Sequence, residues 1–433
     1  MSEVWNHVAC PGCGCVCDDI TLQFGDDGLQ SFQPGCSLGE RWFRDRGQPV
    51  TNAVRIEGEV ASDEEAIDRG AQILAKADYP LIYGLSRSAT PGQRAAIALA
   101  DALGCAIDTT ASMCHGPSIM ALQEFGEVTC SLGEVRNRAD LVIFWGCDPA
   151  SSHPRHAERY SVHARSEWLP NGRADRTIVL IGNEAELDRR RIDASGTQPD
   201  MRIAVPAGND FETLAMLRAL VAGKPVENVP SELRDLVSMM KNCRYGVVFF
   251  GLGLAQTLPT GEAGNVVNGR ADVAALLQLV AELNRFARFT ARRMRLQGNV
   301  SGADNVLCWQ AGYPFAVDFS RGFPRSNPNE FSASELLRRG DVDACVLIGG
   351  ETLHQFPEKA MAHLRTIPTL LLDYPGARSD LSPTVEWTTA VYGLHAEGTI
   401  YRMDNLPMEV HAMQPTNLPT DSDVLTAILN RLS

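Results

Sequence analysis

Residues 139–149 read ADLVIFWGCDP, an apolar run that ends at a glycine and continues into a polar loop. Residues 176–182, RTIVLIG, have the same form. Apolar runs rich in β-branched residues are typical of parallel strands that helices cover on both faces. The two runs therefore predict an α/β fold with buried parallel strands.

Helical patterns alternate with further apolar runs along most of the chain. Short buried strands are predicted at 79–86 and 245–255. Polar starts, apolar residues at helical spacing and closing glycines predict helices at 61–78, 90–104, 209–223, 231–243 and 271–287.

The apolar segments also repeat along the chain, which indicates two domains of similar build. The second member of each pair lies roughly 165–205 residues beyond the first. The pairs are YPLIYGLS with RYGVVFFGLG, ADLVIFWGCDP with VDACVLIGGET, and RTIVLIG with IPTLLLDYP. We therefore predict two doubly wound Rossmann-like domains behind a small N-terminal domain.

The predicted domain boundaries follow from this cadence. Residues 1–56 form the N-terminal domain, and 57–205 and 206–384 form two α/β domains that are free to interleave in space. Residues 385–433 are predicted as a C-terminal segment of strands and turns, because glycines punctuate AVYGLHAEGTIYRMDNLP. Doubly wound sheets bind ligands beyond the carboxyl ends of their strands, which is where the loops WGCDPASSHPRH and GGETLHQFP fall.

Composition excludes several classes of protein. The chain has 433 residues, 44% of them hydrophobic, and a net charge of −14, which disfavours general binding of nucleic acid. No segment approaches the roughly 20 apolar residues of a membrane-spanning helix. The start MSEVWNHVACPG lacks the features of a signal peptide, and no GxGxxG or P-loop follows a predicted strand. We expect a cytoplasmic protein whose twelve cysteines stay reduced.

Four cysteines near the start have the spacing C-x2-C-x3-C-x18-C. Three thiolates on one tight loop and a fourth from a later turn can enclose a 4Fe–4S cluster, and Gly12 and Gly14 let the backbone approach the sulfurs. A structural zinc site is the alternative, and loss of any metal is a third. Cys15 is expected to point away. The four predicted ligands are Cys10, Cys13, Cys17 and Cys36.

A second thiol, Cys114, stands beside His115 in a turn that leads into a predicted helix near Pro117. A helix N-terminus favours the thiolate, which suits a soft metal or nucleophilic attack, and the imidazole can move a proton. The plain alternative is a buried cysteine beside a packing histidine.

Two further polar clusters can each be either a binding site or a purely structural feature. Around HPRH, two histidines and two arginines can bind an anion or a metal, or can simply cover a sheet edge. These residues are His153, Arg155, His156 and Arg159. In RRMRLQGNVSG, Arg292, Arg293 and Arg295 can clamp a phosphate or carboxylate, or can form a solvated turn.

Taken together, these motifs resemble the molybdopterin oxidoreductase superfamily. The chain is most similar to the B subunit of formylmethanofuran dehydrogenase, along its whole length. The segments that carry the resemblance are CPGCGCVCDDI, ASMCHGPSIMALQEFG, GEVRNRADLVIFWGCDPASSHPRH, CWQAGYPFAVDFSRGFPR and GLHAEGTIYRMDNLP.

The resemblance implies a set of cofactors and site residues. The first four cysteines would hold a 4Fe–4S cluster, and Cys114 would ligate tungsten or molybdenum carried by two pterin guanine dinucleotides. His115 and Arg295 would lie at the substrate. Residues that would contact the pterin dinucleotides are Gly116, Gly146, Asp148, His153, Asn299 and Gly349.

The implied reaction interconverts CO2 and formate, for formyl transfer to or from a methanofuran-type carrier in one-carbon metabolism, either methanogenesis or formaldehyde oxidation. The implied partners are an amidohydrolase-like subunit, a formyltransferase-like subunit and a small barrel subunit, without nucleic acid or membrane. A free-standing formate dehydrogenase is disfavoured, because the chain lacks the long C-terminal barrel that such enzymes use to hold their dinucleotide.

Three segments depart from the family pattern. NEAELDRRR replaces an Asp-Pro-Arg stretch, Leu296 stands where the family favours glycine, and PGARSDLSPTVEW differs from a Thr-rich family segment. A bacterial formyltransferase/hydrolase complex, which serves tetrahydromethanopterin-linked formaldehyde oxidation, contains a related subunit that acts as a scaffold without the redox cofactor. That role is the alternative to the dehydrogenase.

Overall fold

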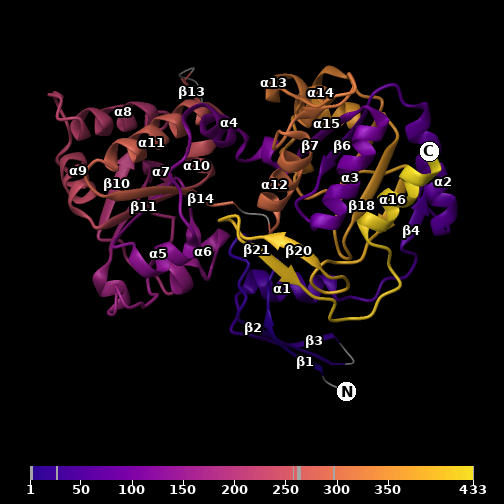
Figure 1. The fold of residues 1–433 in the computed structure, drawn as a ribbon, viewed down its shortest axis with the longest axis horizontal. Coiled ribbons are helices and arrows are strands. Elements are labelled where there is room, and N and C mark those ends of the chain that lie inside the picture. The colour runs from indigo at the N-terminus through magenta and orange to yellow at the C-terminus, as the bar shows by residue number, and fades with distance from the viewer. Residues whose placement is uncertain (1–2, 26–27, 257, 261–264, 296–297, 433) are drawn as a thin grey trace. The chain divides into compact units, whose positions relative to one another are not determined.

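The computed structural model describes residues 3–25, 28–256, 258–260, 265–295 and 298–432 (Figure 1). The chain forms two compact units. The first consists of Met1–Met113 together with Gln297–Ser433, and the second is Cys114–Leu296. Each unit is built around its own sheet.

The second unit contains a parallel sheet in the order β10-β9-β8-β11-β14. Its strands are β8 (Leu141–Trp145), β9 (Thr177–Asn183), β10 (Met201–Val205), β11 (Tyr245–Phe250) and β14 (Arg288–Arg293). The chain continues from β8 to β9 on one side and from β11 to β14 on the other. The loops that follow β8 and β11 therefore diverge, and this point between the two strands is where doubly wound sheets bind ligands.

Amphipathic helices cover this sheet. The apolar residues of α11 pack with those of α4 and α8 into one buried cluster. The helices of the unit are α4 (Gly116–Phe125), α5 (Leu132–Arg138), α6 (Pro149–Ser152), α7 (Glu184–Leu187), α8 (Asp210–Val221), α9 (Ser231–Asn242), α10 (Leu252–Ala255) and α11 (Gly269–Leu283). A π-helical turn at Ala157–Ser161, a 3-10 turn at Gly172–Asp175 and a hairpin of β12 (Leu258–Thr260) and β13 (Asn265–Val267) complete it.

The first unit contains a mixed sheet in the order β16-β15-β7-β6-β17-β18-β19-β4-β5, in which β7 to β19 are parallel. The divergence point here lies between β6 and β17. The strands are β4 (Val54–Ile56), β5 (Glu59–Val60), β6 (Pro80–Gly84), β7 (Ala106–Thr109), β15 (Val317–Asp318), β16 (Arg325–Ser326), β17 (Ala344–Ile348), β18 (Thr369–Asp373) and β19 (Val385–Thr388).

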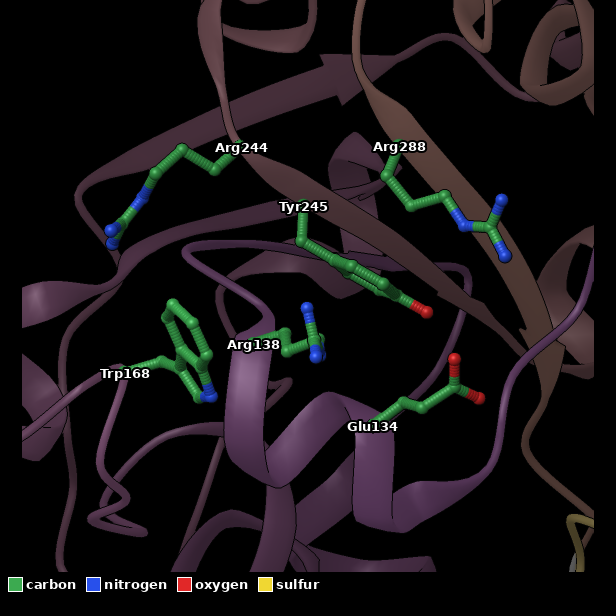
Figure 2. Close-up of a pocket in the computed structure, with 6 residues that line it drawn as sticks. All are labelled: Glu134, Arg138, Trp168, Arg244, Tyr245 and Arg288. Atoms are coloured by element: carbon green, nitrogen blue, oxygen red, sulfur yellow. The ribbon is translucent and has the colours of Figure 1, made fainter.

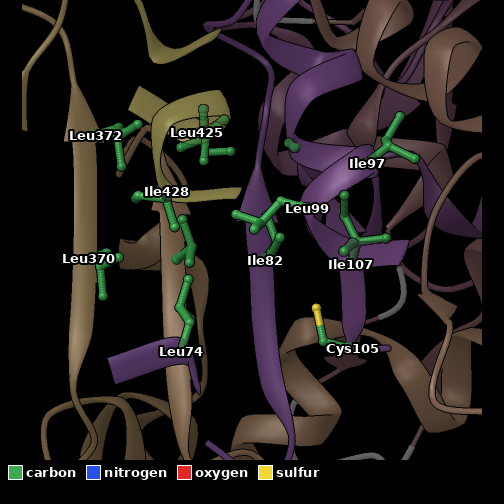
Figure 3. Packing of buried hydrophobic residues seen from close by; sticks show 14 of the residues in the cluster. Leu74, Ile82, Ile97, Leu99, Cys105, Ile107, Leu370, Leu372, Leu425 and Ile428 are labelled. Carbon is green, nitrogen blue, oxygen red and sulfur yellow. The ribbon is translucent and has the colours of Figure 1, made fainter. Parts of the chain in front are cut away.

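Alternate residues of these strands enter two separate cores, so both faces of the sheet are buried. Ile82, Val346 and Leu370 pack on one face with α2, α3 and α16 (Figure 3). Tyr83 and Leu347 pack on the opposite face with α14 and α15. The helices of the unit are α1 (Ser37–Arg46), α2 (Asp63–Lys76), α3 (Thr90–Leu103), α12 (Val300–Ala311), α13 (Pro328–Phe331), α14 (Ala333–Arg339), α15 (Glu358–Leu364) and α16 (Asp421–Leu432).

Smaller elements complete the first unit. The N-terminal antiparallel sheet consists of β1 (Glu3–Val8), β2 (Ile20–Gly25) and β3 (Gly28–Gln33). A hairpin of β20 (Gly398–Tyr401) and β21 (Pro407–Val410) follows the main sheet. Short 3-10 turns lie at Thr110–Met113 and Leu353–Gln355.

The internal repeat is visible in the strand order. The run β7-β6-β17-β18 in the first unit corresponds to β14-β11-β8-β9 in the second, and the three sequence pairs match β6 with β11, β8 with β17 and β9 with β18. Each sheet takes two of these strands from each half of the chain. The predicted boundaries at 205 and 384 therefore do not coincide with the two units.

The C-terminal segment differs from its prediction. Besides strands and turns it contains α16, a helix of 12 residues that packs on α2 and α3. Val424, Leu425 and Ile428 are among its buried residues, at helical spacing. Within the described ranges, no helix is long and apolar enough to cross a bilayer.

A buried carboxyl group in the second unit makes its stability depend on pH. Burial, and then the charges of Asp210 and Glu212, raise the pKa of Asp272 to about 7. Because the folded-state pKa lies above the unfolded value of about 3.9, the folded state binds the proton more tightly. The contribution of Asp272 to the free energy of unfolding is therefore fully present below about pH 4 and is lost as the pH rises through about 7.

Replacing this carboxyl by an amide is expected to stabilise the protein at alkaline pH. We expect Asp272→Asn to raise the melting temperature by about 3 °C at pH 8 and to leave it nearly unchanged at pH 5. Thermal unfolding followed by circular dichroism measures both. An equal shift at the two pH values would contradict the assignment.

Candidate functional site

The structure brings the four predicted N-terminal cysteines together. Cys10 and Cys17 are joined through the backbone, since the Cys10 N–H donates to the Cys17 carbonyl at 2.8 Å. Cys36 is the residue before the first turn of α1, and the N-terminus of that helix favours negative charge. Burial, and then the neighbouring Cys17, Cys13 and Cys36, raise the pKa of the Cys10 thiol well above its usual value. Cys15, the extra cysteine, is fully buried.

Two glycines enclose the Cys10 sulfur. A Cβ atom on Gly39 would lie 2.9 Å from Cys10 Sγ, and one on Gly12 would lie 3.3 Å from it. The backbone therefore forms a cradle that a side chain would fill. Burial and the neighbouring cysteines disfavour the thiolate form of Cys10, and a cationic centre among the four sulfurs would reverse this preference, so this donor set fits an iron–sulfur cluster. In the part of the chain that the structure describes, no three His, Cys, Asp or Glu side chains are arranged to hold a single metal ion.

In the second unit, Cys114 lies immediately before the N-terminus of α4. His115 is the N-cap residue, and the helix opens with Gly116 and Pro117, as the sequence predicted. Cys114 is partly exposed, whereas His115 is only 1% exposed. This position places the thiol at the positive end of a helix of ten residues.

His115 is a neutral imidazole in a cationic environment. Burial, and then the charges of Arg295 and Arg293, hold the pKa of His115 well below its usual value. Ser118 Oγ donates to the His115 carbonyl at 2.8 Å, so it accepts from Nδ1, 3.0 Å away. The ring proton therefore lies on Nδ1. Nε2 is buried and makes no hydrogen bond among the described residues, although the Met294 backbone is close enough to favour the charged ring slightly.

His153 holds the backbone of Arg295. The imidazole is fully buried, and its Nε2 lies 2.7 Å from the Arg295 carbonyl oxygen, to which it donates. Burial lowers the pKa of His153 to about 4, against the opposing effect of this hydrogen bond. His153 therefore holds the backbone of the arginine that the resemblance implies to be at the substrate.

The three arginines of the predicted clamp have separate roles. The Arg292 guanidinium donates twice to the Cys130 carbonyl, at 3.0 and 2.6 Å. Arg293 pairs with Glu127 at 3.2 Å. Arg295 is 4% exposed, and its charge contributes more than that of Arg293 to the low pKa of His115. Leu296, the predicted departure in this motif, lies outside the described residues.

The remaining members of the HPRH cluster are packed into the protein. His156 is fully buried against the rings of Phe249 and Tyr160, with ring centroids 4.5 and 5.9 Å away. Arg155 pairs with Glu158 at 2.9 Å, and Arg159 lies over the Tyr160 ring. These contacts support the packing interpretation for His156.

An open cleft of about 280 Å³ lies at the divergence point between β8 and β11. Gly146 and Asp148 line it together with Cys147, Gly251, Gly253 and Met294. Gly146 has φ +62°, and a Cβ there would lie 2.7 Å from the Leu254 nitrogen, so only glycine fits. The Asp148 carboxylate accepts from the Arg191 N–H and from Ser151 Oγ, so it holds the loops of the cleft together.

The departing segment NEAELDRRR lies beside this cleft. Arg190 pairs with Glu186 at 2.5 Å, is 8% exposed, and occupies the space next to Gly182 and Gly253. Its Nη1 is buried without a hydrogen bond among the described residues. The bulk that the sequence predicted here is therefore a guanidinium that faces the cleft wall.

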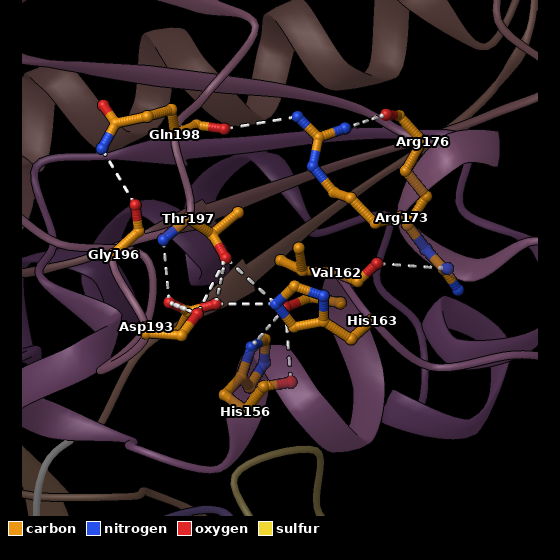
Figure 4. A network of polar contacts seen from close by, with 11 residues as sticks. His156, Val162, His163, Arg173, Arg176, Asp193, Gly196, Thr197 and Gln198 are labelled. Atoms are coloured by element: carbon orange, nitrogen blue, oxygen red, sulfur yellow. Dashed lines mark hydrogen bonds and ion pairs between the residues drawn. The ribbon is translucent and has the colours of Figure 1, made fainter.

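The loop after this segment is held by its own carboxylate. Asp193 Oδ2 lies 2.7 Å from His163 Nε2 and accepts from Thr197 Oγ1 at 2.6 Å (Figure 4). Burial opposes ionisation, but the hydrogen bonds from Thr197, His163 and Ser195 hold the pKa of Asp193 below its usual range. The loop beside the cleft is thus fixed by contacts within the chain.

At the corresponding point of the first unit, an ion network occupies the space after β6 and β17. Arg87 pairs with Asp373 at 2.5 Å and with Glu351 at 3.3 Å, and Ser86 donates to Glu351. Gly349, with φ +84°, lies next to Glu351. The adjoining cavity, lined by Arg46, Arg87 and Asn299 among others, measures only about 80 Å³.

The sequence did not identify Arg46, Arg87, Glu351 or Asp373. The one feature of the sequence that pointed to this region was that the loop GGETLHQFP follows a predicted strand. Asn299, which was predicted to contact a pterin, donates to the Ser88 carbonyl and accepts from the Tyr401 N–H, each at 2.7 Å. Its side chain therefore ties the start of α12 to the loop at Ser88 and to the end of β20.

The geometry defines an α/β protein with two divergence-point sites and a buried thiol loop, and relatives of this chain are known. The B subunit of the tungsten-containing formylmethanofuran dehydrogenase 2 of Methanocaldococcus jannaschii is 35% identical over 100% of this chain and 99% of its own length. The protein of the same description from Methanococcus maripaludis is 32% identical, over 99% of each chain. The chain belongs to the family of formylmethanofuran dehydrogenase B subunits.

A bacterial complex contains a more distant relative. The B subunit of the formyltransferase/hydrolase complex Fhc of Methylorubrum extorquens is 24% identical over 88% of this chain and 97% of its own length. In the crystal structure of the FhcABCD complex of that organism with methylofuran, one chain matches with a TM-score of 0.70 at 22% identity, covering 88% of this chain and 98% of that one. This similarity shows the fold. No family model matches the chain.

The glycine cradle around Cys10 gives a test of the thiol loop. In Gly39→Ala the new methyl group would meet Cys10 Sγ at 2.9 Å and Phe32 at 2.6 Å. We expect a loss of about 1–3 kcal/mol of unfolding free energy and less iron bound per chain. Denaturant unfolding and iron analysis of protein purified without oxygen measure these effects.

Gly133→Ala is the matched control. Its new methyl group would lie 3.6 Å from the nearest atom, Ser131 Oγ, in α5. It is expected to keep both stability and iron. Equal behaviour of the two variants would show that the cradle around Cys10 is not tight.

Proposed function

We propose that this chain is the redox subunit of a formylmethanofuran dehydrogenase complex, which interconverts formate and CO2. The observation that carries the proposal is the buried cluster of His115 and Arg295 beside Cys114 in the second unit. The family membership supports it, since two relatives carry the name of a tungsten-containing dehydrogenase subunit.

The proposed half-reaction balances as formate giving CO2, one proton and two electrons. The Arg295 guanidinium would hold the formate carboxylate through parallel hydrogen bonds. The unprotonated Nε2 of His115 would accept the proton released from carbon, and burial together with the nearby arginines lowers the pKa of His115, which favours the unprotonated ring beforehand. His153 acts through Arg295 and is a positioning residue.

The implied cofactors fit part of this structure. Cys114 would ligate tungsten or molybdenum, and the cleft of Gly146 and Asp148 would hold one pterin dinucleotide. Gly116 and His153, the other contacts that the resemblance implies in this unit, are not among the residues that line the cleft. When bound, the metal–pterin centre would supply an acceptor for the two electrons released from formate. The loop of Cys10, Cys13, Cys17 and Cys36 would hold the 4Fe–4S cluster, to pass electrons onward.

The second pterin dinucleotide fits less well. Gly349 and Asn299 are its predicted contacts, and the cavity there is about 80 Å³, whereas the cleft in the second unit measures about 280 Å³. The side chains of Arg87, Glu351 and Asp373 occupy the neighbouring space at these strand ends. This observation favours a second candidate function, that of a cofactor-free scaffold in a formyltransferase/hydrolase complex.

In both candidate functions the chain works within a complex. We propose amidohydrolase-like, formyltransferase-like and small barrel subunits as its partners. Two relatives are B subunits of named dehydrogenases, and another belongs to an Fhc complex. In the dehydrogenase, the amidohydrolase-like subunit would join or remove the formyl group on a methanofuran-type carrier.

Removing the thiol at position 114 separates the two candidates. In the complex purified without oxygen, we expect Cys114→Ser to lower formate oxidation with a dye acceptor by at least about 100-fold, because a hydroxyl is a poor ligand for a soft metal. Tungsten and molybdenum should be lost, while the melting temperature and formyl hydrolysis stay unchanged. Cys243→Ser, on the partly exposed cysteine after α9, is the control.

Metal content decides between the candidates in the unaltered complex. Tungsten or molybdenum together with dye reduction supports the dehydrogenase. Formyl hydrolysis without either metal supports the scaffold, and unchanged dye reduction in Cys114→Ser would overturn the role of that thiol.

The neutral state of His115 predicts a pH dependence. Because the pKa of His115 lies below the usual value, the acidic limb of formate oxidation should lie at a lower pH than an ordinary histidine would give, as Nε2 becomes protonated. His115→Gln should lower turnover by about 100-fold or more and remove this acidic limb. A pH–rate profile of both proteins is the measurement, and an identical acidic limb in the variant would contradict the assignment.

A further inference from the structure

The second unit has another pocket, which lies at the opposite ends of the sheet strands from the cleft. It measures about 620 Å³ and is open to solvent. Tyr245 and Arg288 are the first residues of β11 and β14, which places the pocket at the amino ends of the strands. Its lining residues are Glu134, Arg138, Trp168, Arg244, Tyr245 and Arg288 (Figure 2).

The pocket concentrates positive charge on an acidic protein. Arg138 and Arg288 form no ion pair with any described carboxylate, whereas Arg244 lies 3.1 Å from Asp140. Glu134 is already used, since its carboxylate accepts from the Ser131 N–H in the capping box of α5. Two guanidinium groups are therefore available, in a chain whose net charge is −14.

Aromatic surface accompanies these charges. Trp168 is 56% exposed, and the Arg138 guanidinium lies 5.2 Å from the centre of its ring. Tyr245 is 5% exposed, and Figure 2 shows its ring among the side chains of Arg138, Arg288 and Glu134. Trp, Tyr and Arg are the residues that contribute most often to binding energy at protein interfaces.

The backbone around the pocket indicates which anion fits. In a parallel sheet, the helices that precede the strands end at this edge, and α5 ends at Arg138 while α9 ends at Asn242. Helix C-termini present carbonyl groups, which disfavour phosphate, and at the other end of α5 the Glu134 N–H already donates to Ser131 Oγ in the capping box. Flexible carboxylates can meet the guanidinium groups without such donors.

We infer that this pocket is the docking site for an acidic segment of another subunit of the complex. Two or more carboxylates of that segment would bind Arg138 and Arg288, and an apolar side chain would lie on Trp168. The inference rests on the assembly in the proposed function and is independent of its redox chemistry. A nucleoside phosphate is the other ligand that aromatic rings and arginines can bind, and it serves as an outcome of the test.

Charge reversal tests the docking site in the co-expressed complex. We expect Arg288→Glu and Arg138→Glu each to weaken retention of this chain in the complex by about 10-fold or more, with weaker dependence on salt than the unaltered complex shows. Arg234→Glu, an equal charge change on the exposed side of α9, is the control and should assemble normally. Arg288→Gln removes the positive charge without introducing a carboxylate, so it is the milder variant at this position. The melting temperature of every variant shows whether it is folded.

A photo-crosslinking residue in place of Trp168 identifies the occupant. Crosslinking in the assembled complex should join this position to a peptide of a partner subunit rich in Asp and Glu, and Arg288→Glu should suppress it. Crosslinks to neutral or basic segments only, displacement by ATP or GTP, or equal assembly of Arg288→Glu and Arg234→Glu would each overturn the inference. Formate oxidation and metal content test the redox proposal separately.

Discussion

The fold depends on two parallel pairings between segments far apart in the chain. β6 pairs with β17 in the first unit, and β8 pairs with β11 in the second. In each pair the connections that follow run in opposite directions, so the two loops separate and leave room beyond the strand ends. Because both faces of each sheet are covered, the strand ends are where polar side chains can gather. The loops after these four strands carry Arg87, Glu351 and the Gly146–Asp148 turn, while Arg295 follows β14 and Asp373 ends β18.

The two sites of this duplicated fold have diverged. In the second unit, the loops after β8 and β11 leave a cleft, and α4 and the segment after β14 bring His115 and Arg295 together. In the first unit, Arg87 pairs with both Glu351 and Asp373 in the equivalent place. The same backbone plan thus supports one open site and one largely filled by the chain itself. This asymmetry is what keeps the scaffold function in consideration beside the dehydrogenase.

The sequence predicted much of this, for identifiable reasons. Runs such as LVIFW and TIVLIG are apolar at nearly every position, which only strands covered on both faces require, so β8 and β9 could be placed. Cysteine spacing gave the thiol loop, and the start of α4 followed from Pro117. The sequence left open that the two α/β domains interleave, but it could not show which strands are exchanged, because an apolar run does not specify its partner.

Side-chain pairings between distant segments were equally hidden. Arg87 and Glu351 are separated by more than half of the chain, and neither belongs to a motif. The pocket of Arg138, Trp168 and Arg288 draws on separate elements that only the sheet brings together. His153 was predicted as a cofactor contact, and its hydrogen bond to the Arg295 backbone could be seen only in three dimensions.

The central claim is that the N-terminal thiols share one inorganic cluster. Iron and acid-labile sulfide, with electron paramagnetic resonance after reduction, should be determined on the complex purified without oxygen. The account predicts about four iron atoms and about four sulfides per chain from this loop, with the signal of a reduced cubane that is lost in Cys10→Ser. About one zinc atom per chain and no labile sulfide would contradict it.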